Sequence, residues 1–178
     1  MKLNPEKDAI NTIAQLILTA ARTAPKAKGE DEIITGIIDD KEALAVEMDK
    51  IATRDDASLF FKRDAANIRN ADSVLLIGLQ FKKPLGVNCR ACGFDCSTIL
   101  QQKSVNADYK GPVCSIRAID LGIAVGAAAA VAKDLCVDNR VMYTVGVAAR
   151  NLKLMDAQII LGLPLSIKGK NIFFDRSS

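Results

Sequence analysis

The 178-residue chain contains no histidine and no tryptophan. Without histidine it cannot build a serine–histidine–acid triad, a cysteine–histidine pair or a histidine-ligated zinc or haem site. Its 24 basic and 21 acidic residues leave a net charge of only +3, which does not favour nucleic acid or an anionic membrane surface as a partner. The most apolar run, residues 121–132, is shorter than the roughly 20 residues of a membrane-spanning helix. We therefore expect a soluble protein that binds neither nucleic acid nor membrane.

The first residues, MKLNPEKD, are polar and mixed in charge, with no apolar segment close behind them and no small-residue cleavage site. This pattern is not that of a targeting signal, so we expect a cytoplasmic protein. In a reducing cytoplasm, clustered cysteines usually serve metal binding or redox chemistry and not structural disulfides.

Helical and strand-like patterns alternate along the chain, which predicts one α/β or α+β domain over residues 1–178, a central sheet with helices packed on it. The strand at 73–79 is apolar without interruption, as expected when helices cover both faces of the sheet. A first helix lies between Asn4 and Pro25. Further helices are expected at 40–53 (with Asp39 and Glu42 as a capping box), 56–69, 115–135 and 148–155, and strands at 33–38, 73–79, 141–146, 158–163 and 171–174.

Four of the five cysteines lie within residues 89–114, in the pattern C-x2-C-x3-C-x17-C. The short gaps let one loop present three thiolates to an iron–sulfur cluster, and a remote cysteine supplies the fourth. Gly93 permits a tight turn in that loop, and Arg90 and Phe94 would help to set the reduction potential. The segment 86–115 is therefore a cysteine-rich, ferredoxin-like insertion that predicts a metal site at Cys89, Cys92, Cys96 and Cys114.

A structural zinc site made of the same four thiolates is the main alternative, although zinc sites usually pair two knuckles of two ligands each. Free thiols or disulfides are the remaining possibility. Cys136 has no cysteine neighbour, and we expect it to be a small buried apolar residue. The acidic groups at 30–32, 39–40 and 55–56 are expected to be solvated caps, and Asp120 to pair with Arg117.

Residues 89–96 (CRACGFDC), 111–114 (GPVC) and 118–126 (AIDLGIAVG) resemble the family of uncharacterised prokaryotic proteins that contain a ferredoxin domain. The cysteines also resemble the small four-iron domain of electron-transfer subunits, in which the second-to-third spacing is one residue longer. The resemblance implies a 4Fe–4S cluster held by Cys89, Cys92, Cys96 and Cys114.

The flanking segments AARTAP at 20–25 and ILGLP at 160–164 are similar to those of flavin-dependent nitroreductases, although the N-terminal phosphate motif of that family is absent. This similarity implies a nitroreductase-like sandwich fold, an intertwined homodimer and FMN as a cofactor. The basic residues that would then contact the flavin phosphate are Arg22, Lys26, Lys28, Lys168 and Lys170.

The leading hypothesis is an iron–sulfur redox protein that carries electrons through one 4Fe–4S cluster, coupled to a flavin, a redox partner protein or a small-molecule electron acceptor. The first alternative is a four-cysteine zinc protein with a non-enzymatic interaction role. The second is an FMN-dependent, nitroreductase-like oxidoreductase. If the chain is an enzyme, it belongs to the oxidoreductases.

Overall fold

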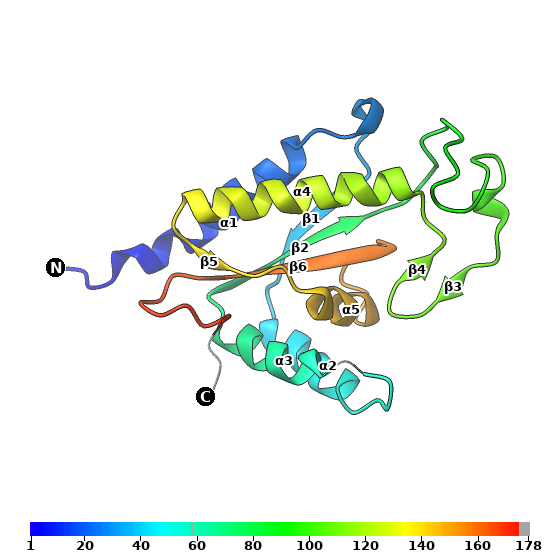
Figure 1. The fold of residues 1–178 in the computed structure, drawn as a ribbon. Coiled ribbons are helices and arrows are strands. Elements are labelled where there is room, and N and C mark those ends of the chain that lie inside the picture. Colours follow the sequence, from blue (N-terminus) through cyan, green and yellow to red (C-terminus); the bar gives the residue numbers. More distant parts are fainter. Residues whose placement is uncertain (58, 175–178) are drawn as a thin grey trace.

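The computed structural model describes residues 1–57 and 59–174, which form an α+β sandwich around an antiparallel sheet (Figure 1). The sheet has the strand order β1-β2-β6-β5. Ile33 lies opposite Leu79 in the first pair, and Ser73 lies opposite Leu165 in the second. The strands are β1 (Ile33–Ile37), β2 (Ser73–Leu79), β5 (Asp138–Asn139) and β6 (Ile159–Ser166).

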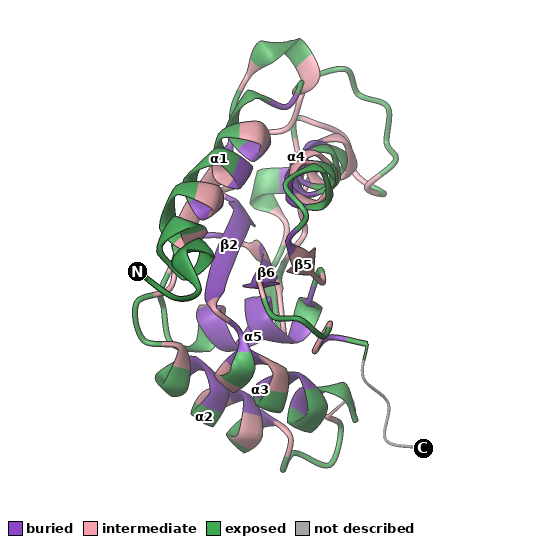
Figure 2. Cartoon of the chain, turned by 90° about the vertical axis from the view of Figure 1, so that its left-hand side faces the viewer, coloured by how far each residue is buried: buried purple, intermediate pink, exposed green. Residues whose placement is uncertain are grey.

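Helices cover both faces of this sheet, so that every residue of β2 is buried (Figure 2). Two helices lie on one face and three on the other, and each layer encloses its own apolar core. The first layer consists of α1 (Ile10–Thr23) and α4 (Ser115–Asp134). The second consists of α2 (Lys41–Ile51), α3 (Phe60–Asn70) and α5 (Tyr143–Asn151).

Most of the elements expected from the sequence are present, and their ends agree within a few residues. The first helix begins with a 3₁₀ turn, Pro5–Ala9, before α1. Residue 58 of the expected helix 56–69 lies outside the described residues, and α3 follows it. The cap of α2 is Asp40 and not the expected Asp39, because the Asp40 carboxylate accepts a 2.9 Å hydrogen bond from the Ala43 N–H.

Two expected strands are wrong. The β-branched run at 141–146 is largely helical, since α5 begins at Tyr143 and only Met142 forms a bridge, opposite Gly162. Residues 171–174 form no strand: residues 172–174 are bends, and the Asn171 side chain accepts a 2.9 Å hydrogen bond from the Phe173 N–H. In both places tertiary packing overrides the strand preference of the residues.

Helix α4 is long and apolar enough to cross a membrane by length and composition alone. In the structure it packs one side against α1 and β2, with Ala124, Ala128 and Ala132 fully buried. Its opposite side is exposed and also apolar, with Ile119 55% and Ile123 40% exposed. The buried side is that of a core helix, and the exposed side is an apolar face that the single chain leaves uncovered.

The cysteine segment extends beyond the sheet at the N-terminal end of α4 (Figure 1). It contains a short 3₁₀ turn, Ile99–Gln101, and a two-stranded hairpin of β3 (Val105–Asn106) and β4 (Lys110–Gly111). The hairpin is fastened to α5, because Arg150 donates to the Ala107 carbonyl at 2.8 Å and to the Asp108 carbonyl at 3.2 Å. The hairpin part of the segment is thereby fixed to the body of the protein.

Candidate metal centre

The cysteine loop is tightly wound because three of its residues adopt left-handed backbone conformations. Asn88, Arg90 and Gly93 have φ angles of 49°, 58° and 86°. Asparagine and glycine tolerate this conformation, whereas arginine adopts it at a steric cost. The Gly93 N–H donates to the Arg90 carbonyl at 2.8 Å, which closes a turn between Cys89 and Cys96. The expected tight turn at Gly93 is therefore present.

Two contacts join the beginning of the loop to its end. The Asn88 side chain accepts a 3.0 Å hydrogen bond from the Cys96 N–H. Arg90 forms an ion pair with Asp95 at 2.7 Å, and this hydrogen bond, with a second from Asn88, holds the pKa of the Asp95 carboxyl below its ordinary value. Residues 88–96 consequently form a closed loop that carries three thiols.

The fourth cysteine lies in the core, directly before α4. Cys114 is 4% exposed and belongs to the apolar cluster between the sheet and the α1–α4 layer. Cys92 and Phe94 are partly buried and pack against this same cluster. Cys89 is exposed and Cys96 is half-buried. The loop and Cys114 therefore contribute to the same apolar cluster.

The backbone around Cys114 leaves its thiol free for another role. The Cys114 carbonyl accepts the first helical hydrogen bond, from the Ala118 N–H at 3.0 Å, while its side chain makes no capping bond. The first turn of α4 has no acidic residue. The amide groups at the start of a helix favour negative charge nearby, so this position suits a thiolate or a metal–thiolate centre.

Within residues 1–57 and 59–174, no three side chains of the metal-ligating types are gathered closely enough to hold an ion. The donor set nevertheless fits a thiolate-bound centre, since the segment 86–115 holds four of the five cysteines, one wound loop carries three of these, and the chain has no competing histidine. The Cys92 thiol donates a weak hydrogen bond to the Phe94 carbonyl at 3.6 Å. Gathering the four sulfurs thus requires new side-chain orientations within the loop and at Cys114.

Cys136 is exposed, and the expectation that it is buried is wrong. It follows α4 with a φ of 57°, a left-handed position that commonly ends a helix. The helix end faces outward at this point, so the apolar run before the residue gave a misleading signal.

The basic residues predicted to contact a flavin phosphate lie at two ends of the sheet. Arg22, Lys26 and Lys28 surround the end of α1, where Arg22 pairs with Asp31 at 2.7 Å. The Lys26 side chain is 5% exposed and donates to the Ala21 carbonyl at 3.0 Å, and Lys28 donates to the Leu85 carbonyl at 2.8 Å.

The two remaining lysines follow β6. Lys168 donates to the Asn70 carbonyl, near the start of β2, and Lys170 lies two residues further on. Arg22, by contrast, bonds to the Ile33 carbonyl, beside the end of β2. Seven residues of extended strand span about 20 Å. One phosphate cannot contact both groups within a single chain.

A buried cluster of charge beside Cys114 was missed from the sequence. Arg117 has a fully buried side chain and pairs with Glu30, with Asp120 at 3.4 Å and with Glu32 at 3.8 Å. The pairing with Asp120 was expected, but the acidic run at 30–32 is not a solvated cap. The hydrogen bond from Arg117 lowers the pKa of the Glu30 carboxyl. The sequence signal for this cluster was a charged residue, Arg117, inside a mostly apolar helix.

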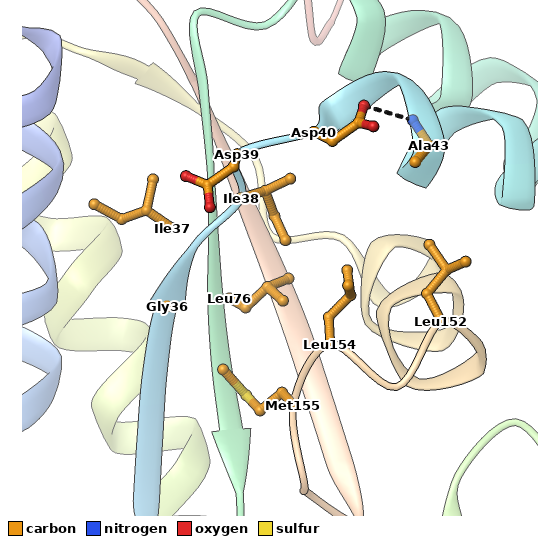
Figure 3. A pocket seen from close by; sticks show the side chains of 10 residues that line it. All are labelled: Gly36, Ile37, Ile38, Asp39, Asp40, Ala43, Leu76, Leu152, Leu154 and Met155. Carbon is orange, nitrogen blue, oxygen red and sulfur yellow. Dashed lines mark hydrogen bonds between the residues drawn. The ribbon is translucent and has the colours of Figure 1, made fainter.

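Two of the cavities in the described part of the chain differ in their relation to the cysteine segment. The larger, of about 360 Å³, has mainly apolar walls that include Ile38, Leu76 and Leu154, with two aspartates at its rim (Figure 3). None of its lining residues belongs to the cysteine segment. The smaller, of about 230 Å³, lies between Ile99 and Pro112 of that segment.

The fold is that of the nitroreductase-like flavoproteins. An NADPH:FMN oxidoreductase from Vibrio harveyi matches with a TM-score of 0.56 and 16% identity, over 90% of this chain and 60% of its own. NfrA1 nitroreductase from B. subtilis matches with a TM-score of 0.58 and 11% identity, over 94% of this chain and 61% of its own. A nitroreductase with bound FMN from Desulfitobacterium hafniense matches with a TM-score of 0.54 and 14% identity, over 89% of this chain and 78% of its own. The chain therefore spans about 60% of the first two of these enzymes.

Within this fold, the chain belongs to the family described as "Uncharacterized protein containing a ferredoxin domain". The family profile matches residues 110–176, which include Cys114 but not the three loop cysteines. An "Uncharacterized protein" from Archaeoglobus fulgidus is 44% identical over 184 aligned positions, which cover 99% of this chain and 98% of the relative. Two of the resemblances expected from the sequence are thus confirmed, the one to the family and the one to the nitroreductase-like fold.

Proposed function

We propose that this protein is an iron–sulfur electron carrier that binds one 4Fe–4S cluster through Cys89, Cys92, Cys96 and Cys114. The observation that carries this proposal is a closed loop of three thiols that packs against the same apolar cluster as the buried fourth thiol at the start of α4. A bound 4Fe–4S cluster supplies one-electron transfer at a potential set by its surroundings. The reducing cytoplasm expected from the sequence keeps the four thiols available.

The surrounding residues have distinct roles in this proposal. The amide groups at the start of α4 stabilise the negative charge of the thiolates, and the partly buried Phe94 limits the access of water. Arg90 is engaged with Asp95, so it closes the loop and contributes little net charge of its own. A small-molecule electron acceptor would approach through the cavity beside Ile99 and Pro112.

Anaerobic purification with metal and sulfide analysis tests this proposal. The 4Fe–4S assignment predicts a brown protein whose broad visible absorbance is bleached by reductant, with about four iron and four sulfide ions per chain. A colourless protein with one zinc ion per chain, whose melting temperature falls on chelation, would support the structural alternative instead. Cys136→Ala is the matched control, because this exposed thiol lies outside the proposed ligand set.

A second candidate, an FMN-dependent oxidoreductase, is favoured by the fold that the chain shares with an FMN-bound nitroreductase. In this reading the flavin exchanges electrons with the cluster or with a small substrate at a dimer interface. Because the two groups of basic residues lie apart in one chain, the phosphate is held by Arg22, Lys26 and Lys28 or by Lys168 and Lys170, and not by all five. Yellow colour that is released on denaturation without iron would support this candidate.

We further propose that the protein is a homodimer that pairs through the exposed face of α4. This face carries Ile119 and Ile123, and an added Cβ at Gly122 or Gly126 would meet nothing within 4 Å in the single chain. Small residues let a second helix approach closely, and the large aliphatic side chains supply apolar area. Sedimentation should therefore give a dimer for the wild type and a monomer for Ile123→Glu. A monomeric wild type would refute this part of the proposal.

A further inference from the structure

Arg117 is the most deeply buried charged side chain near the candidate metal centre, with no exposed surface. It lies three residues after Cys114, within the first turn of α4. Besides its three carboxylate partners, it donates to the carbonyls of Ala27 and Glu30, each at 3.3 Å. Its Nε atom has no hydrogen-bond partner. Such a buried guanidinium is retained only where its surroundings compensate for the loss of water.

The carboxylates around Arg117 also hold the chain that leads into the cysteine loop. Glu32 accepts hydrogen bonds from the N–H groups of Lys82 and Lys83, at 3.2 Å and 3.3 Å. Lys83 also pairs with Glu30 at 3.3 Å. Residues 82–85 continue directly to Cys89, only a few residues further along the chain. The position of the loop is therefore linked to Arg117 through these two acids.

The same cluster holds the other side of the candidate site. Asp120 pairs with Arg117 and accepts a 2.9 Å hydrogen bond from the Ala27 N–H, which fixes the first turns of α4 against the 24–32 segment. Cys114 immediately precedes this turn. The chain that leads to the three loop thiols and the helix that follows the fourth thiol thus meet at one buried guanidinium.

We infer that Arg117 is a positioning residue, which sets the spacing between the Cys89–Cys96 loop and Cys114 so that four thiolates reach one metal centre. The inference rests on the proposed function. Replacing a buried ion cluster by apolar residues is often neutral or stabilising, so folding alone does not require this one. A metal centre whose ligands come from two separate segments does require a fixed distance between them.

Co²⁺ titration of the reduced, metal-free protein tests this inference without any activity assay, because thiolate-bound Co²⁺ gives a visible absorption. Arg117→Lys retains the charge but loses the planar fork that joins three acids. Arg117→Met combined with Glu32→Gln and Asp120→Asn removes the buried charges together, so that this variant folds without an unpaired buried carboxylate. Arg69→Met is the matched control, since Arg69 also bridges two acids, Glu42 and Asp49, but lies away from the cysteine segment.

Both Arg117 variants are expected to bind Co²⁺ about 10–100-fold more weakly than the wild type, the range typical of residues that orient metal ligands. Circular dichroism should show unchanged secondary structure, and Arg69→Met should bind like the wild type. If the wild type binds Co²⁺ through four thiolates and both Arg117 variants bind equally well, the positioning role is wrong while the proposed function stands. If the wild type binds no Co²⁺ through these cysteines, the proposed function fails, and the inference fails with it.

Discussion

Replacing Cys114 with alanine separates the two roles that the structure and the proposal give to this residue. The side chain is 4% exposed and lies in the apolar core. Removing a buried group of about one methylene in size costs about 0.8 kcal/mol in transfer free energy, and the cavity that remains adds to this. We therefore expect Cys114→Ala to lower the unfolding free energy of the metal-free protein by about 1–2 kcal/mol.

The matched substitutions Cys89→Ala and Cys136→Ala affect exposed side chains, so each should change the metal-free stability by no more than about 0.5 kcal/mol. In the metal-loaded protein the pattern changes. Cys89→Ala and Cys114→Ala should both lose the metal and the stability that it supplies, whereas Cys136→Ala should retain both. Denaturant unfolding of each variant, with and without metal, measures the free energy of unfolding in both states. Retention of the full metal content by Cys89→Ala would refute the assignment of this ligand.

Three further predictions concern packing and protonation. Gly146→Ala should destabilise the fold by about 1–3 kcal/mol or more, because an added Cβ would lie 1.6 Å from the Ile160 carbonyl oxygen. Gly36→Ala should be tolerated, because there the added Cβ would lie 3.5 Å from the nearest side-chain atom. Equal melting temperatures for the two variants would contradict this account. Burial and the hydrogen bond to Asp108 raise the pKa of Tyr143 to about 12. The contribution of this tyrosine to stability should therefore be complete below about pH 10 and be lost toward pH 12. Ultraviolet titration, in a chain with two tyrosines and no tryptophan, should show that Tyr143 does not ionise near pH 10. The lowered pKa of Glu30 stabilises the fold above about pH 4.3, and this stabilisation decreases as the pH falls. Glu30→Gln should therefore flatten the acid side of the plot of unfolding free energy against pH. An unchanged slope would exclude the pairing of Glu30 with Arg117 as a source of the acid sensitivity.

The sequence predicted the α+β architecture well where hydrophobic periodicity dominates. The uninterrupted apolar strand β2 and the long alanine-rich helix α4 have their expected positions. Helix α5 was misread because residues 144–149 are all buried, which removes the polar face that identifies a helix. Its β-branched residues then resemble a strand, while Thr144 is held in the core by a 2.7 Å hydrogen bond to Asp64.

The candidate site could be predicted only in part. A motif of neighbouring residues is visible in the sequence, whereas a contact between residues far apart in the chain is not. The cysteine spacing indicates a thiolate loop directly. The contacts between Arg117 and Glu30 join residues 87 positions apart, and no local pattern reports such a pair. The opposite placement of Lys26 and Lys168 likewise follows from the course of β2 and β6, which residue type alone does not determine.

The most direct test of the central claim is the iron, sulfide and zinc content of the anaerobically purified wild type, measured beside a variant in which Cys89, Cys92 and Cys96 are replaced by alanine. The account predicts iron and sulfide in equal amounts in the brown wild type and neither in the variant. Iron and sulfide retained by the variant, or a colourless wild type that contains zinc alone, would contradict it.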